Sequence, residues 1–146
     1  MAIDRHGAGL AVLRILLGVF FLFQGIGRLS WFGSSLVLAR QLDAWLRGVS
    51  PASISARYLT RFIMPHTAVF ARLVPTGELA AGLAMLFGFW TPFFAFLAFC
   101  MVLNFHIASG AIFTYGFLTN GYGLPVLGST LALTLGGVRL PWSIRS

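Results

Sequence analysis

The stretch PTGELAAGLAMLFGFWTP, residues 75–92, decides the fold, because it is small and apolar almost throughout and suits a membrane-spanning helix. Glu78 nevertheless lies well inside this stretch. A carboxylate in hydrocarbon costs several kcal/mol unless a partner pairs with it or a proton neutralises it. The stretch therefore predicts a membrane helix together with a polar environment that other parts of the chain supply.

Composition places the whole chain in a membrane. Of its 146 residues, 58% are hydrophobic and 9% are charged, whereas soluble domains carry roughly 25% charged residues. We expect one integral, multi-pass membrane domain over residues 1–146. The net charge of +7 comes from arginines that flank apolar runs, which favours anchoring at lipid headgroups over nucleic-acid binding. With Cys100 as the single cysteine, no internal disulfide and no zinc site are expected.

Turn signals divide the apolar sequence into four expected spans, at about residues 8–27, 68–89, 92–108 and 118–137. The segment FWTP, residues 89–92, predicts a tight hairpin with Pro92 in the first turn of the next helix. A glycine-rich connection over residues 108–123 separates the last two spans. The expected fold class is an all-α integral membrane protein built as a four-transmembrane-helix bundle.

Residues 33–65, between the first two spans, are expected to form two short amphipathic helices. Apolar residues recur there at helical spacing, with arginines between them: Leu38, Leu42, Trp45, Leu46 and Val49, then Ile54, Tyr58, Phe62 and Ile63. Pro51 is expected to separate the two helices and Pro65 to end the second. This pattern predicts interfacial helices that lie on the membrane surface or cap the bundle.

The second span carries its own packing signals. Ala80, Ala84 and Gly88 recur at every fourth position, a stripe that lets two helix backbones approach closely. Pro75 lies one turn before Glu78 and removes a backbone hydrogen bond, which predicts a kink.

Depth along the helices predicts a polar layer. Glu78 precedes Thr91 by 13 residues and Asn104 follows it by 13, so both should lie roughly 20 Å from the hairpin. Seven polar residues are expected towards the loop side of the bundle: Gln24, Glu78, Asn104 and His106, with Arg28, Arg72 and Tyr122 above them. Glu78 is the candidate for proton exchange and the others are candidate quinone or lipid ligands. The alternative is that these groups only hydrogen-bond between helices.

Two further expectations concern Arg14 and cofactors. Arg14 is expected about 9 Å in from the terminal side, within snorkelling reach of headgroups and too far from Glu78 to pair with it. His106 is the only histidine expected in a span. A b-type haem is therefore not expected, since it usually needs two axial ligands. We expect no covalently bound cofactor and no metal, and regard a quinone as the candidate ligand.

Two motifs carry a family resemblance. Residues 14–29, RILLGVFFLFQGIGRL, contain an arginine, a glycine and then G-x-G-[KR]-L, and residues 77–92, GELAAGLAMLFGFWTP, form a Gly-Glu-rich span followed by a short hairpin. Both resemble the DoxX family of four-helix membrane proteins. Four residues occupy the motif positions, which are helix-packing and polar-layer sites: Arg14, Gly25, Arg28 and Glu78.

The resemblance implies a role in membrane redox chemistry. Some DoxX proteins are subunits of thiosulfate:quinone oxidoreductases, and others belong to redox complexes with soluble thiol- or superoxide-handling partners. The expected function is thus an integral subunit of a quinone-linked complex in the bacterial inner membrane, contacting lipids and other subunits and lacking a redox centre of its own. The alternative is a non-catalytic accessory subunit that stabilises a larger membrane complex.

Overall fold

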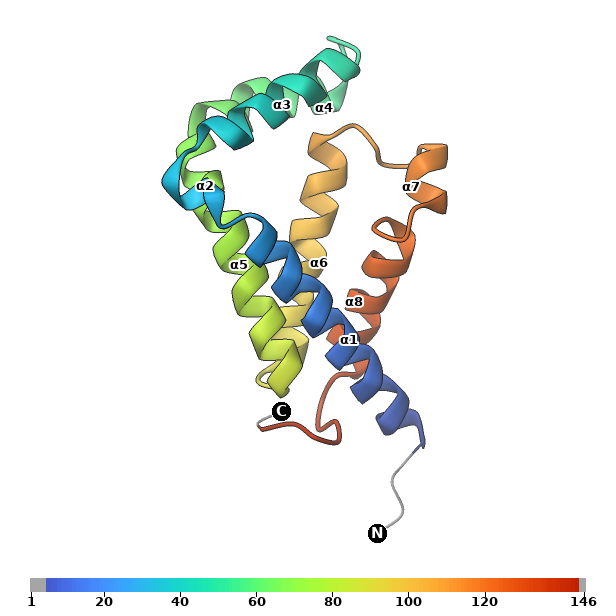
Figure 1. Cartoon of the computed structure of the whole chain (residues 1–146). Coiled ribbons are helices and arrows are strands. Elements are labelled where there is room, and N and C mark those ends of the chain that lie inside the picture. Colours follow the sequence, from blue (N-terminus) through green and yellow to red (C-terminus); the bar gives the residue numbers. More distant parts are fainter. Residues whose placement is uncertain (1–4, 145–146) are drawn as a thin grey trace.

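The computed structural model describes residues 5–144, which form helices and no β-strand (Figure 1). The helices are α1 (Arg5–Gly27), α2 (Ser30–Gly33), α3 (Leu36–Gly48), α4 (Ile54–Tyr58), α5 (Thr67–Phe87), α6 (Thr91–Ala108), α7 (Tyr115–Thr119) and α8 (Leu124–Gly136). The core of the bundle lies where α1, α5, α6 and α8 meet, around Phe21, Met85, Val102 and Leu133. The all-α prediction is confirmed.

Three helical stretches are long and apolar enough to cross a membrane: Arg5–Gly33, Ile54–Phe87 and Thr91–Ala108. They agree with the first three predicted spans. The fourth predicted span, residues 118–137, begins with the end of α7 and then contains the 13-residue α8, which is shorter than the roughly 20 residues of a perpendicular span. Residues 120–123 turn between the two helices, and the Asn120 side chain accepts a hydrogen bond there from the Tyr122 N–H at 2.9 Å.

The second span begins earlier than predicted, because helical structure runs without a break from Ile54 to Phe87. Ser53 caps its start by accepting a hydrogen bond from the Ala56 N–H at 3.0 Å. The prediction that Pro65 ends a separate helix is therefore wrong. A π-helical turn (Leu59–Ile63) leads into a 3₁₀ turn (Met64–His66) that holds Pro65 near its start, where a missing N–H is tolerated.

The amphipathic segment before Pro51 contains a helix, α3, which buries Leu38 and Leu42. These leucines pack with Leu59 and Ile63, so α3 and the first turns of the second span form one layer. In Figure 1 this layer closes one end of the bundle, above α6. We refer to residues 36–66 as the cap.

Helices α1 and α5 cross at very close range. A Cβ atom on Gly18 would lie 2.6 Å from the backbone nitrogen of Leu86, and one on Gly82 would lie 2.4 Å from that of Leu22. Only glycine fits at both positions, because real Cβ atoms do not approach a backbone so closely. The crossing thus brings the two backbones into direct contact.

The small residues singled out by the sequence have different roles in this contact. Gly25 packs against Leu79, since a Cβ there would lie 2.7 Å from the Leu79 Cγ. Ala84 is buried and Ala80 is half-buried. The tightest points of the contact between α1 and α5 are Gly82 and Gly18, neither of which belongs to the predicted stripe of Ala80, Ala84 and Gly88.

The hairpin between α5 and α6 forms as predicted. Gly88 ends α5 with a φ of 70°, Trp90 has a φ of 44°, and Pro92 lies in the first turn of α6. Pro75 lies inside α5, which remains helical on both sides of it. The hairpin makes the second and third spans antiparallel, and Glu78 and Asn104 line the same cavity between them and the cap.

The C-terminal segment folds back beneath the bundle and receives Arg14. This arginine is fully buried and donates from Nη2 to the Trp142 carbonyl at 2.9 Å and from Nη1 to the Ser143 hydroxyl. Ile144 donates its N–H to the Phe87 carbonyl at 3.0 Å. The prediction that Arg14 snorkels to headgroups is therefore wrong, because its Nη1 and Nη2 donate to Ser143 and Trp142 inside the protein, while its buried Nε has no hydrogen-bond partner among residues 5–144.

Candidate functional site

Glu78 has a dedicated cationic partner. The Arg28 side chain, in the turn after α1, places Nη1 2.5 Å from Oε1 of Glu78. The same Nη1 lies 3.1 Å from the Gln24 side-chain oxygen, one helical turn earlier. Glu78 itself is only 3% exposed. The polar environment predicted around Glu78 therefore exists, and it consists of Arg28 held by Gln24.

This ion pair borders a cavity of about 300 Å³ beneath the cap. Its volume is at the lower end for small-molecule sites. Four polar residues line it: Arg28, Glu78, Asn104 and Tyr122. The apolar wall comes from α1, α2, α3, α5 and α6 and from Ile63, and its larger residues are Phe21, Trp31, Leu38, Leu42, Trp45, Ile63, Phe70, Met101 and Phe105.

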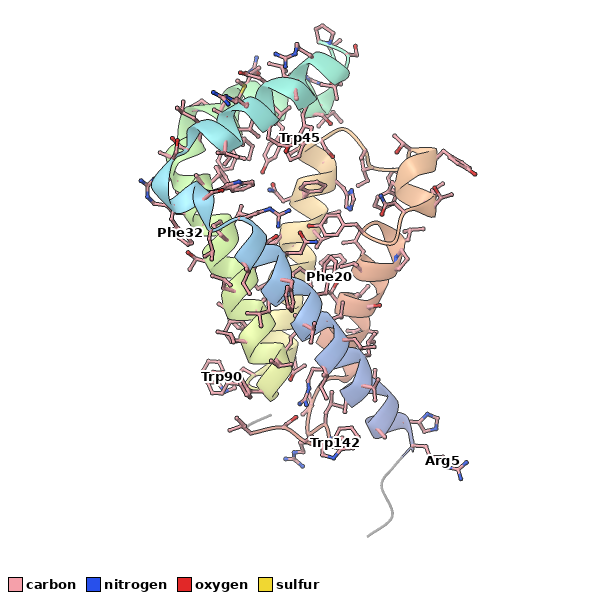
Figure 2. All side chains as sticks on the ribbon, viewed as in Figure 1. Arg5, Phe20, Phe32, Trp45, Trp90 and Trp142 are labelled. Carbon is pink, nitrogen blue, oxygen red and sulfur yellow. The ribbon has the colours of Figure 1, made fainter. Side chains whose placement is uncertain are left out.

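Aromatic contacts hold the roof of the cavity over α6. The rings of Trp45 and Phe105 meet edge to face, with their centroids 5.0 Å apart, and Figure 2 shows Trp45 between α3 and the end of α6. The Arg28 guanidinium carbon lies 5.4 Å from the centre of the Trp31 ring, within the range of a cation–π interaction. Trp31 on α2 thus helps to fix the position of Arg28, while Trp45 of the cap covers the cavity above α6.

The polar lining groups differ in what they can still bind. The Asn104 side-chain oxygen accepts a hydrogen bond from the Tyr58 hydroxyl at 2.5 Å. Burial raises the pKa of the Tyr122 phenol, although the nearby Arg28 charge opposes this effect. The phenol is therefore uncharged at neutral pH. Oε2 of Glu78 is buried and has no hydrogen-bond partner among residues 5–144.

The exposed part of the cavity lining lies on two neighbouring helices. Of the lining residues, only Leu73 on α5 and Cys100 on α6 are exposed. Both helices are long and apolar enough to cross a membrane.

Three predicted site residues lie outside the cavity lining. Arg72 is exposed and donates to the Ala68 carbonyl at 2.7 Å, one turn back on its own helix. His106 is buried behind Tyr122, with Nε2 3.0 Å from the Tyr122 carbonyl. Gln24 contacts the ion pair through Arg28. Asn104, Arg28 and Tyr122 line the same cavity as Glu78.

The cap residues of the cavity were not predicted as site residues. The helical spacing of Leu38, Leu42 and Trp45 indicates a buried face, but a local pattern does not show which neighbour covers that face. Tyr58 likewise reaches Asn104 across 46 residues of sequence. Within residues 5–144, no group of three His, Cys, Asp or Glu side chains is placed to hold a metal ion.

A family model described as DoxX matches residues 9–114. The chain belongs to the DoxX family. The match contains the ion pair, the cap and Asn104, whereas Tyr122 and α8 lie beyond it. No curated protein and no solved structure matches the chain. With its three apolar helices, this DoxX protein is an integral membrane protein in contact with lipid.

Proposed function

We propose that this DoxX protein is the quinone-binding membrane subunit of a redox complex. The observation that carries the proposal is an apolar, aromatic cavity that is bordered by one buried ion pair and whose two exposed lining residues lie on candidate membrane spans. A quinone has a flat ring with polar oxygens and an apolar tail. In this proposal the ring lies between the aromatic wall and the polar groups, and the tail leaves between α5 and α6, beside Leu73 and Cys100.

Each lining group would then have a distinct part in binding. Glu78 exchanges a proton with a ligand oxygen, since it is the only carboxylate among the described lining residues. Arg28 neutralises that carboxylate when it is ionised. Asn104 and Tyr122 orient the ring by hydrogen bonding. In this proposal the chain has no redox centre of its own, so a partner subunit supplies the electrons.

Quinone binding can be measured on the purified protein by tryptophan quenching. Trp31 and Trp45 line the cavity, so a decyl-tailed benzoquinone should quench their fluorescence saturably. Ala108→Leu places extra atoms in the cavity wall and should weaken binding. Ala132→Leu adds the same atoms on the exposed surface of α8 and should not. Quenching that does not saturate, or equal binding by both variants, would contradict the proposal.

The second candidate function is that of an accessory subunit. Large aromatic residues on the outside of α6 favour it, because Phe93 and Phe96 are 57% and 52% exposed and could pack against partner helices as well as lipid. Saturable binding in the isolated protein separates the two candidates, since an accessory role does not require a ligand in the cavity.

A further inference from the structure

The cap has a hydrophobic cluster of its own, distinct from the core of the bundle. Its buried large side chains all come from the cap: Leu38, Leu42, Leu59 and Ile63. Four residues from outside the cap join the cluster: Trp31 of α2, Phe70 and Ala71 of α5, and Ala108 at the end of α6. A unit that packs mainly within itself can separate from its neighbours without unfolding. The cap can therefore move as one body.

Both chain connections of the cap lie at its α5 edge (Figure 1). The first connection contains α2, which packs against α5. The second, Met64–His66, runs directly into α5. It is a 3₁₀ turn that follows a π-helical turn, and such changes of helix type often mark a hinge. Pro65 weakens this point further, because proline has no N–H to donate along the helix.

The opposite edge of the cap is held on α6 by side-chain contacts. The Tyr58 hydroxyl donates to the Asn104 side-chain oxygen at 2.5 Å, and the Ser55 hydroxyl donates to the Ile107 carbonyl at 2.6 Å. The edge-to-face contact of Trp45 with α6 accompanies them. Hydrogen bonds of this kind can be exchanged for bonds to water at a modest net cost. This edge can thus separate from α6 more readily than the α5 edge can.

We propose that the cap is a hinged lid, which swings about Met64–His66 and lifts from the end of α6. Four residues of the cap line the cavity: Leu38, Leu42, Trp45 and Ile63. Lifting the cap consequently opens the cavity to water at the end of the bundle. This route is separate from the α5 and α6 side proposed for a ligand tail, and it does not depend on the identity of the ligand.

Thiol labelling tests whether the cap opens. Ala108 is 2% exposed and lines the cavity beneath the cap, whereas Ala98 is 0% exposed on the same helix and lies in the core of the bundle. Each is replaced by cysteine in Cys100→Ser protein held in lipid nanodiscs. The reagent is 2-sulfonatoethyl methanethiosulfonate, whose charge keeps it out of the bilayer. The Ala108→Cys thiol should react at least tenfold faster than the Ala98→Cys thiol, because lifting the cap exposes the first and only unfolding exposes the second.

Weakening the contacts with α6 should speed this reaction. Tyr58→Phe combined with Ser55→Ala removes both hydroxyls that bind α6. The Ala108→Cys thiol should then react about tenfold faster, the ratio expected for the loss of two ordinary hydrogen bonds. Tyr115→Phe combined with Ser129→Ala removes the same two groups from α7 and α8 and should leave the rate unchanged.

Two results would overturn the lid. Equal reaction rates of the Ala108→Cys and Ala98→Cys thiols would show that the cap does not open apart from the bundle. An unchanged rate after loss of both hydroxyls would show that these contacts do not hold it closed. Should that double variant fail to fold, the comparison of the two thiols beneath an unaltered cap still decides.

Discussion

Replacing Arg28 with glutamine should destabilise the protein more than any single change at its partner. Glu78 is 3% exposed and Arg28 is 18% exposed. Without Arg28, the carboxylate stays buried with no cation near it. Breaking a buried pair in this way costs about 3–5 kcal/mol. Protonation of Glu78 limits the loss, so the variant should be less stable at alkaline pH than at mildly acidic pH.

The reverse substitution, Glu78→Gln, should cost less. Arg28 keeps its contact with the Gln24 oxygen at 3.1 Å and its position over Trp31, and its partial exposure lets water solvate the charge. The double variant removes both charges and should be more stable than Arg28→Gln alone. A double-mutant cycle isolates this coupling.

Stability can be measured by denaturant unfolding of the purified protein in mixed micelles, at several pH values for each variant. The Asp43→Asn protein serves as the control for loss of a surface charge. Equal losses for the two single variants, or simple additivity in the double variant, would refute the assignment of Arg28 as the partner that compensates a buried carboxylate.

Two further predictions concern packing. Gly82→Ala should destabilise the protein by about 1–3 kcal/mol, because the new Cβ would lie 2.4 Å from the Leu22 backbone. A Cβ on Gly9 has no atom within 4 Å, so Gly9→Ala should be neutral or slightly stabilising. Denaturant unfolding of the two variants measures the difference. Arg14→Met removes both side-chain hydrogen bonds to the C-terminal segment, and trypsin should then cleave after the exposed Arg139 about tenfold faster, as timed by mass spectrometry.

Each of these two predictions has a result that would contradict it. Ser143→Ala removes one of the two Arg14 contacts and should accelerate cleavage less than Arg14→Met. Cleavage at the wild-type rate in both variants would show that Arg14 does not hold the segment. An unchanged stability of Gly82→Ala would mean that α1 and α5 can separate at little cost.

Much of the fold could be predicted because its signals are local. Apolar runs of sufficient length predict the first three spans, and Gly88 with Pro92 predicts the hairpin. The error at Pro65 arises because a proline rule describes α-helices, whereas the chain changes to π and 3₁₀ turns there. Before α8, the Asn120 side chain accepts a hydrogen bond from the Tyr122 N–H, a local turn that competes with helix formation.

The site was only partly predictable. Counting residues from the hairpin brought Glu78 and Asn104 to one level, since helical rise is constant. The pairing of Glu78 with Arg28 and not with Arg72 depends on which face of each helix turns inward, and the depth estimate places both arginines on the same side of the bundle. The partners of Arg14 lie 128 and 129 residues away, and no short-range pattern indicates such a contact.

The Arg28–Glu78 pair also has a consequence for how the chain enters the membrane. A helix with an unpaired acidic residue near its centre inserts at a cost of about 2.5–3.5 kcal/mol. Helix α5 carries Glu78 near its centre. Arg28 leaves the ribosome first, at the end of α1, so the cation is in place before Glu78 arrives. The carboxylate of α5 can therefore pair with this cation as α5 is inserted, and the glycines at the crossing of α1 and α5 fix the register in which the two helices join.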